Sequence, residues 1–81
     1  MNKADYQKQI IDLRAKIARE RQDMKRDNES NARSIKSASS PALKASCRKR
    51  KIDCAERHKR NIENLQRQIA QAQLNKARAP K

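Results

Sequence analysis

Apolar side chains recur every three or four residues in both halves of the chain, with a polar interruption in each half. In the first half these side chains are Tyr6, Ile10, Leu13, Ile17, Met24 and Ile35. In the second half they are Leu43, Cys47, Cys54, Ile62, Leu65, Ile69 and either Ala72 or Leu74. Side chains at this spacing share one face of an α-helix. The pattern predicts an all-α protein with two long helices, at about residues 3–36 and 41–78.

The segment between the two apolar stripes contains the residues that end and begin helices. It reads Ser37-Ala38-Ser39-Ser40-Pro41. Ser40 suits the N-cap of a helix, and Pro41 suits the first helical position, where no amide hydrogen is needed. We therefore expect a turn at about residues 37–40, which makes the single domain, residues 1–81, an antiparallel coiled-coil-like hairpin.

A hairpin with this turn brings together residues whose numbers add to about 82. The apolar pairs are then Ile10 with Ala72, Leu13 with Ile69, and Ile17 with Leu65. In the more polar middle, His58 is expected opposite Met24, and Cys54 opposite Asn28. A sheet is a poor alternative, because the chain has no Val, Thr, Phe, Trp or Gly for strands and tight turns.

The predicted core is thin for a chain of 81 residues. Few large apolar side chains lie on the stripes, and a small domain needs dense apolar packing to offset the entropy of ordering its residues. We expect a second copy, a protein partner or a polyanion to complete the structure. The simplest such assembly is a homodimer in which two hairpins form a four-helix bundle.

The charge is strongly positive, with 22 Lys and Arg against 9 Asp and Glu, and a net charge of +13. Such a field attracts polyanions, foremost nucleic acid, and a solvated surface that keeps the protein soluble is the alternative. Residues 41–81 hold 12 of the bases and only 3 of the acids. The candidate phosphate-binding residues are Lys44, Arg48, Lys49, Arg50, Lys51, Arg57, Lys59 and Arg60, with Arg19, Arg21, Lys25 and Arg26 from the first half.

The kind of partner is narrowed by the aromatic content, because Tyr6 is the only aromatic residue. Proteins that grip single strands stack bases on several aromatic rings. We therefore expect contacts to the nucleic acid backbone without base specificity, for DNA or RNA. The alternative is a protein interaction module that docks on an acidic partner, as an accessory, inhibitor or assembly factor of a phage or mobile element does.

Residues 45–51 resemble the core of the basic region of basic leucine zipper transcription factors, in which a continuous helix enters the major groove. The resemblance implies DNA binding by this segment. However, Ser40 stands where that family has an asparagine, and Pro41 interrupts the helix. Only one of the expected zipper leucines is present among His58, Leu65, Ala72 and Ala79. The short match does not assign the chain to that family. The tetrapeptide Arg48 to Lys51 also fits a nuclear import signal.

Five of the nine acids have a base four residues later, which predicts ion pairs on the helix surfaces. These pairs are Asp12 with Lys16, Glu29 with Arg33, Asp53 with Arg57, Glu56 with Arg60, and Glu63 with Arg67. Such pairing leaves few carboxylates free for chemistry. With one histidine and no glycine-rich phosphate loop, we do not expect an enzyme.

Cysteine and histidine usage favours structural roles. Cys47 and Cys54 are about 10 Å apart on one helix, too far for a disulfide between them. Cys54 and His58 could together hold a metal, but zinc requires four ligands, so we predict no metal and no cofactor.

The longest apolar run is Ile10-Ile11. We therefore expect no membrane span, no signal peptide, and reduced thiols in the cytoplasm, or in the nucleus of a eukaryotic host.

Overall fold

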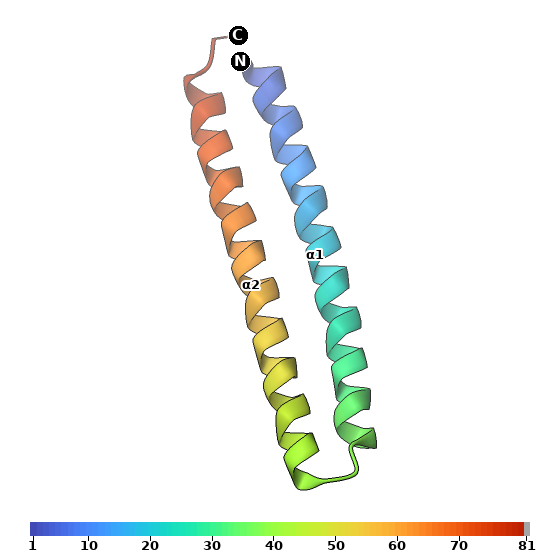
Figure 1. Ribbon diagram of the computed structural model, residues 1–81. Coiled ribbons are helices and arrows are strands. Elements are labelled where there is room, and N and C mark those ends of the chain that lie inside the picture. The colour runs from blue at the N-terminus through green and yellow to red at the C-terminus, as the bar shows by residue number, and fades with distance from the viewer. Residues whose placement is uncertain (81) are drawn as a thin grey trace.

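The protein folds as two helices and a short turn, described by a computed structural model for residues 1–80. Helix α1 spans Lys3–Ser37 and helix α2 spans Pro41–Arg78, and the described residues contain no strand. The helices run antiparallel, so that both ends of the chain lie at the same end of the hairpin (Figure 1). Lys81, the last residue of the predicted domain, lies outside the described residues.

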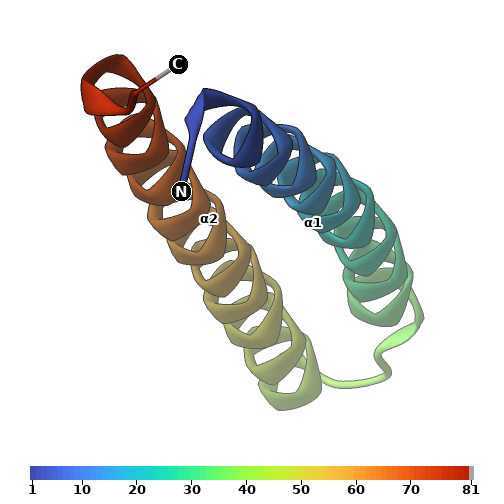
Figure 2. The same ribbon diagram turned by 90° about the horizontal axis from the view of Figure 1, so that it is seen from above.

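The hairpin is long and only one layer thick. The Cα atoms extend over 62 × 15 × 11 Å. Seen along its length, the structure consists of α1 and α2 side by side, with no third element covering either side (Figure 2). No helix in residues 1–80 has the length and apolar character required to cross a membrane.

Both helices begin with a side-chain cap. Ser40 Oγ accepts a hydrogen bond from the Leu43 amide at 3.1 Å, and Pro41 occupies the first position of α2. The sequence predicted this N-cap from the same two residues. At the start of α1, Asn2 Oδ1 accepts from the Asp5 amide at 2.9 Å, and Asp5 Oδ2 accepts from the Asn2 amide at 3.1 Å. This reciprocal cap satisfies two amides that the helix leaves unpaired.

The apolar core lies toward the open end of the hairpin. It consists of Ile10, Leu13, Ile17, Ile62 and Ala72, which are all buried. Of the two residues that the sequence left open, Ala72 is the one in the core, since Leu74 is 46% exposed.

The sequence also placed Leu43 on the apolar stripe, and this was wrong, since Leu43 is 48% exposed. Helix α1 ends at Ser37, so no turn of α1 faces the first turn of α2.

Contacts between the helices agree with the predicted register. Lys76 Nζ donates to Gln7 Oε1 at 2.6 Å, and these residue numbers add to 83. Asn61 Nδ2 donates to Glu20 Oε1 at 2.9 Å, and their numbers add to 81, close to the expected 82. The register therefore holds from the open end to the middle of the hairpin.

Candidate functional site

A buried histidine lies between two carboxylates in the middle of the hairpin. His58 of α2 has Nδ1 at 2.6 Å from Glu20 Oε1 and Nε2 at 2.7 Å from Asp27 Oδ2, both on α1. Ionised carboxylates accept hydrogen bonds and donate none, so both contacts are hydrogen bonds when each ring nitrogen carries a proton, as in the imidazolium. Asn61 donates to the same Glu20 oxygen. Charged hydrogen bonds therefore join the two helices at this level.

These contacts shift the pKa of all three charged groups. The hydrogen bonds to Asp27 and then Glu20 raise the pKa of His58 above its ordinary 6.5. Hydrogen bonds from Asn61 and His58 lower the pKa of Glu20, and the hydrogen bond from His58 lowers the pKa of Asp27. The Asp27 side chain is 42% exposed against 20% for Glu20, so water screens the Asp27 contact more strongly.

The sequence placed His58 opposite Met24 and did not predict its partners. Met24 is half-buried on α1, while Glu20 and Asp27 lie one helical turn before it and one turn after it. Both acids reach the ring from these neighbouring turns. In residues 1–80, no buried side-chain nitrogen or oxygen is left without a hydrogen-bond partner. The seam is the line along which α1 and α2 meet. In its polar middle, every buried side-chain nitrogen and oxygen thus has a hydrogen-bond partner.

A second contact brings a thiol into the cluster. Cys54 was predicted opposite Asn28, but its Sγ lies 3.6 Å from Asp27 Oδ2, and Arg57 Nη2 lies 3.5 Å from the same sulfur. Cys54 and Cys47 are both free thiols and are half-buried. Single ligand atoms of Asp27, Cys54 and His58 all lie within 4.8 Å of one another.

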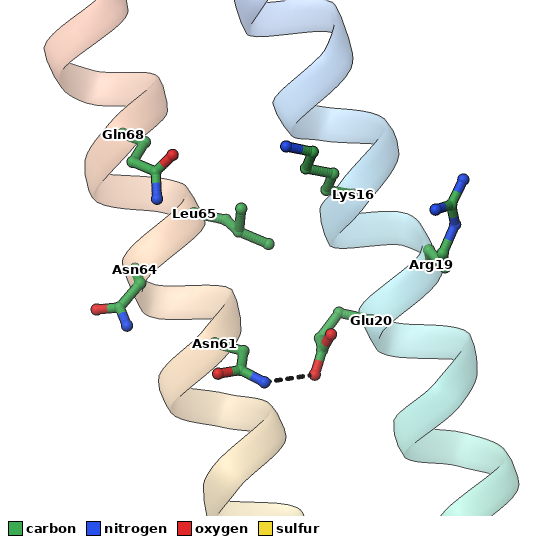
Figure 3. A pocket seen from close by; sticks show the side chains of 7 residues that line it. All are labelled: Lys16, Arg19, Glu20, Asn61, Asn64, Leu65 and Gln68. Carbon is green, nitrogen blue, oxygen red and sulfur yellow. Dashed lines mark hydrogen bonds between the residues drawn. The ribbon is translucent and has the colours of Figure 1, made fainter.

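Two open grooves run between the helices on one side of the hairpin. The first has a volume of about 470 Å³ and is lined by Lys16, Arg19, Glu20, Asn61, Asn64, Leu65 and Gln68. In Figure 3 the Glu20 and Leu65 side chains point between the helices, and the hydrogen bond from Asn61 to Glu20 joins α2 to α1. Arg19 points away from α2.

The second groove, of about 530 Å³, is lined by Asp27, Ser30, Asn31, Ser46, Lys49, Arg50, Asp53, Cys54 and Arg57. Several lining residues on α2 follow one another at three or four residue intervals through both grooves: Ser46, Arg50, Asp53, Arg57, Asn61, Asn64 and Gln68. Residues at this spacing form one row along a helix. We call the side that carries both grooves the grooved side.

The predicted phosphate-binding residues are divided between the two sides. Eleven of the twelve are exposed, and Lys51 on the seam is half-buried. Arg19, Lys49, Arg50 and Arg57 line the grooves. Arg26, seven residues after Arg19, belongs to the same row. Lys59 and Arg60 border a hollow on the outer surface of α2 together with Glu56 and Glu63.

The four remaining predicted bases, together with Lys59, lie on the opposite side, which we call the ungrooved side. Groove residues such as Arg57 precede a seam residue, whereas Arg48 and Lys59 follow the seam residues Cys47 and His58. Consecutive helical residues are about 100° apart, so residues before and after the seam point to opposite sides. By this criterion the predicted phosphate-binding bases of the ungrooved side are Arg21, Lys25, Lys44, Arg48 and Lys59.

Within residues 1–80, the bases have almost no ion-pair partners. In the part of the chain that the structure describes, Arg26 is the only Lys or Arg with a carboxylate oxygen within 4.0 Å, and its partner is Asp23. The five ion pairs predicted at four-residue spacing do not form. Arg57 instead contacts the Cys54 sulfur, and Arg67 donates to Asn64. On an exposed helix surface such pairs contribute little, so the long side chains follow other partners.

Comparison with known proteins gives no match. No family model matches the sequence, and neither a curated protein nor a solved structure is similar to it.

Proposed function

We propose that this protein binds nucleic acid through the phosphate backbone, without reading the bases. The proposal is supported by one observation above all: the ungrooved side carries exposed bases without carboxylate partners. Glu20, Asp23, Asp27 and Asp53 belong to the grooved side or the seam, so on the ungrooved side the five predicted bases outnumber the acids Glu29 and Glu63 and the net charge is positive. Such a surface neutralises phosphates, and the released counterions favour binding.

On the ungrooved side of α2, the bases Lys44, Arg48 and Lys59 form a row whose length suits a duplex. Lys44 and Lys59 are 15 residues apart on one helix, which corresponds to about 22 Å along the axis. This is the axial length of about six base pairs at about 3.4 Å per pair. Tyr6, the only aromatic residue, is half-buried near the open end, so stacking on bases does not contribute along this row.

The test compares two variants that remove equal charge. The first neutralises the ungrooved side with R21Q, K25Q, R48Q and K59Q, and the second neutralises the open end with K3Q, K8Q, R67Q and R78Q. Each lowers the net charge from +13 to +9. Binding to a duplex is measured by fluorescence anisotropy over a range of salt concentrations. We expect the salt slope of the first variant to fall by about 0.9 for each lost phosphate contact, and that of the second to stay near wild type.

Two results would contradict the proposal. The first is wild-type binding that is absent or indifferent to salt. The second is an equal loss in both variants, because net charge alone would then explain the affinity. If the partner is an acidic protein instead, a pulldown retains that protein after nuclease treatment, whereas loss of all partners on nuclease treatment supports nucleic acid.

We also propose that two hairpins pair through their grooved sides to form a four-helix bundle. The grooved side carries both signs of charge, with Asp53 beside Lys49 and Arg50 and with Asp23 beside Arg26, so it is self-complementary. The net positive charge of the ungrooved side opposes self-pairing there and leaves that side free for phosphates. Sedimentation equilibrium should give twice the chain mass of 9.4 kDa, and D23N/D53N should weaken the dimer. A wild-type monomer at all concentrations would refute this assembly.

Such a role assigns the protein to the compartment that holds its nucleic acid, the cytoplasm or a eukaryotic nucleus.

A further inference from the structure

The Asp27, Cys54 and His58 cluster offers three different ligand atoms at one point between the helices. Asp27 comes from α1, and Cys54 and His58 come from successive turns of α2. Their ligand atoms lie within 4.8 Å of one another, with Sγ at 3.6 Å and Nε2 at 2.7 Å from Asp27 Oδ2. Carboxylate, thiolate and imidazole are the three side-chain ligands that Zn²⁺ uses. From this juxtaposition we propose that the protein binds one zinc ion per chain through these three residues.

The spacing suits tetrahedral coordination. Zinc bonds of about 2.0–2.3 Å place neighbouring ligand atoms about 3.3–3.8 Å apart. The Cys54 to Asp27 separation of 3.6 Å already falls in this range. The Nε2 to Oδ2 separation needs to open by about 1 Å, and the half-exposed Asp27 carboxylate has room to rotate. The metal replaces the proton on Nε2 and the thiol proton of Cys54.

The surroundings also match those of a metal-binding histidine. Such a histidine commonly donates its second ring N–H to a carboxylate, which fixes the ring and its tautomer. Here Nδ1 lies 2.6 Å from Glu20 Oε1, and Asn61 holds that oxygen in place. Nε2 is thereby directed at Asp27 and Cys54. Such a supporting carboxylate is not needed for core packing, since the apolar seam ends near Ile17 and Ile62.

In the single hairpin, the fourth ligand position faces solvent. Asp27 and Cys54 both line the second groove, which is open to water. Three protein ligands plus a water molecule is the arrangement of zinc sites with an open position. Arg57 Nη2, 3.5 Å from the Cys54 sulfur, can donate to the thiolate without competing for the metal.

The site can be tested with cobalt as a spectroscopic probe for zinc. The full chain is treated with chelator and kept under reductant, and Co²⁺ is then titrated until Zn²⁺ displaces it. We expect one equivalent of Co²⁺ and the near-ultraviolet charge-transfer band of a cobalt–thiolate bond. C54S should lose this band, whereas C47S, the same substitution two turns earlier on α2, should keep it.

Three further variants identify the other ligands and the supporting carboxylate. D27N and H58Q should lower the affinity by at least the effect of E20Q, which we expect to weaken binding about 10- to 100-fold with the band retained. Far-ultraviolet circular dichroism checks that each variant is helical. The proposal is overturned if wild type shows no thiolate band, if C47S and C54S behave alike, or if D27N and H58Q both bind like wild type.

Discussion

His58 and Asp27 are 31 residues apart in the chain, yet His58 Nε2 and Asp27 Oδ2 lie 2.7 Å apart across the hairpin. The other ring nitrogen reaches Glu20, two helical turns earlier on α1. One imidazolium thereby ties two positions of α1 to α2 at the level where the apolar core ends. It gives two carboxylates of α1, two turns apart, one shared cationic partner from α2.

This arrangement predicts that stability depends on pH through His58. Because its folded pKa is raised, the protonated ring stabilises the fold fully below about pH 6.5, and this contribution is lost as the pH rises through the folded pKa. Glu20 and Asp27 have pKa values lowered from their ordinary 4.5 and 3.8. Their contributions to stability are therefore present above about pH 4.5 for Glu20 and pH 3.8 for Asp27, and are lost on acidification. The cluster therefore stabilises the fold most between about pH 4.5 and 6.5. The measurement is the free energy of unfolding in urea at a series of pH values, with the protein treated with chelator.

The control for this pH dependence is H58Q. Glutamine can donate to one carboxylate but carries no proton to titrate, so the fall in stability as the pH rises above about 6.5 should largely disappear. At about pH 5.5 the substitution should cost about 1–3 kcal/mol, because it removes hydrogen bonds to charged groups. Equal pH profiles for wild type and H58Q would show that other groups cause the change.

The sequence predicted the all-helical hairpin and its register well, because both depend on patterns that repeat along the chain. Ile10, Leu13 and Ile17 mark one face of a helix whatever surrounds them, and Ser40 and Pro41 mark a helix start. The His58 cluster could not be read in this way. Its partners come from the other helix, and a one-to-one register assigns only Met24 to His58. The two acids were visible in the sequence, since Glu20 and Asp27 lie one turn before and one turn after Met24. To predict the cluster, however, one would have to know that both acids contact a residue one turn away from the position directly opposite them.

The prediction of ion pairs on the helix surfaces was wrong for a different reason. Spacing alone indicates that Asp53 can meet Arg57, but it does not rank the competing partners of a flexible arginine. In the structure Arg57 extends toward the Cys54 sulfur. Exposed pairs differ by only tenths of a kcal/mol, so a pattern in the sequence cannot decide among them.

Truncation of the core should show where the stability lies. Leu13 is 5% exposed, so Leu13→Ala should cost about 2–5 kcal/mol through lost burial and a residual cavity. Ile11 is its neighbour on the same helix and is 55% exposed, so Ile11→Ala should change stability by less than about 0.5 kcal/mol. Thermal unfolding followed by circular dichroism compares the two. Similar losses for both would mean that Ile11 is covered in solution.

The turn should depend on one serine of two. Ser40 Oγ caps α2 by accepting from the Leu43 amide, so Ser40→Ala should cost about 1 kcal/mol. Ser39 is exposed and lies outside both helices. Ser39→Ala is the matched control, because it also removes a serine hydroxyl but leaves the cap in place. The free energy of unfolding of each variant in urea is the measurement. A larger loss for Ser39→Ala would place the start of α2 one residue earlier.

The register itself can be tested by a disulfide between the helices. Because Cys54 Sγ lies 3.6 Å from Asp27 Oδ2, Asp27→Cys in a Cys47→Ser background should form a bond with Cys54 on mild oxidation. Closing the 27-residue separation should stabilise the oxidised protein by about 3.5 kcal/mol in the chain-entropy estimate. Asp23→Cys in the same background lies one turn further from Cys54, about 6 Å along the axis, and should stay reduced. Mass spectrometry of the oxidised, alkylated proteins separates the two results. Ready crosslinking at position 23 and none at position 27 would mean that the helices are offset by one turn, which would also separate Asp27 from His58.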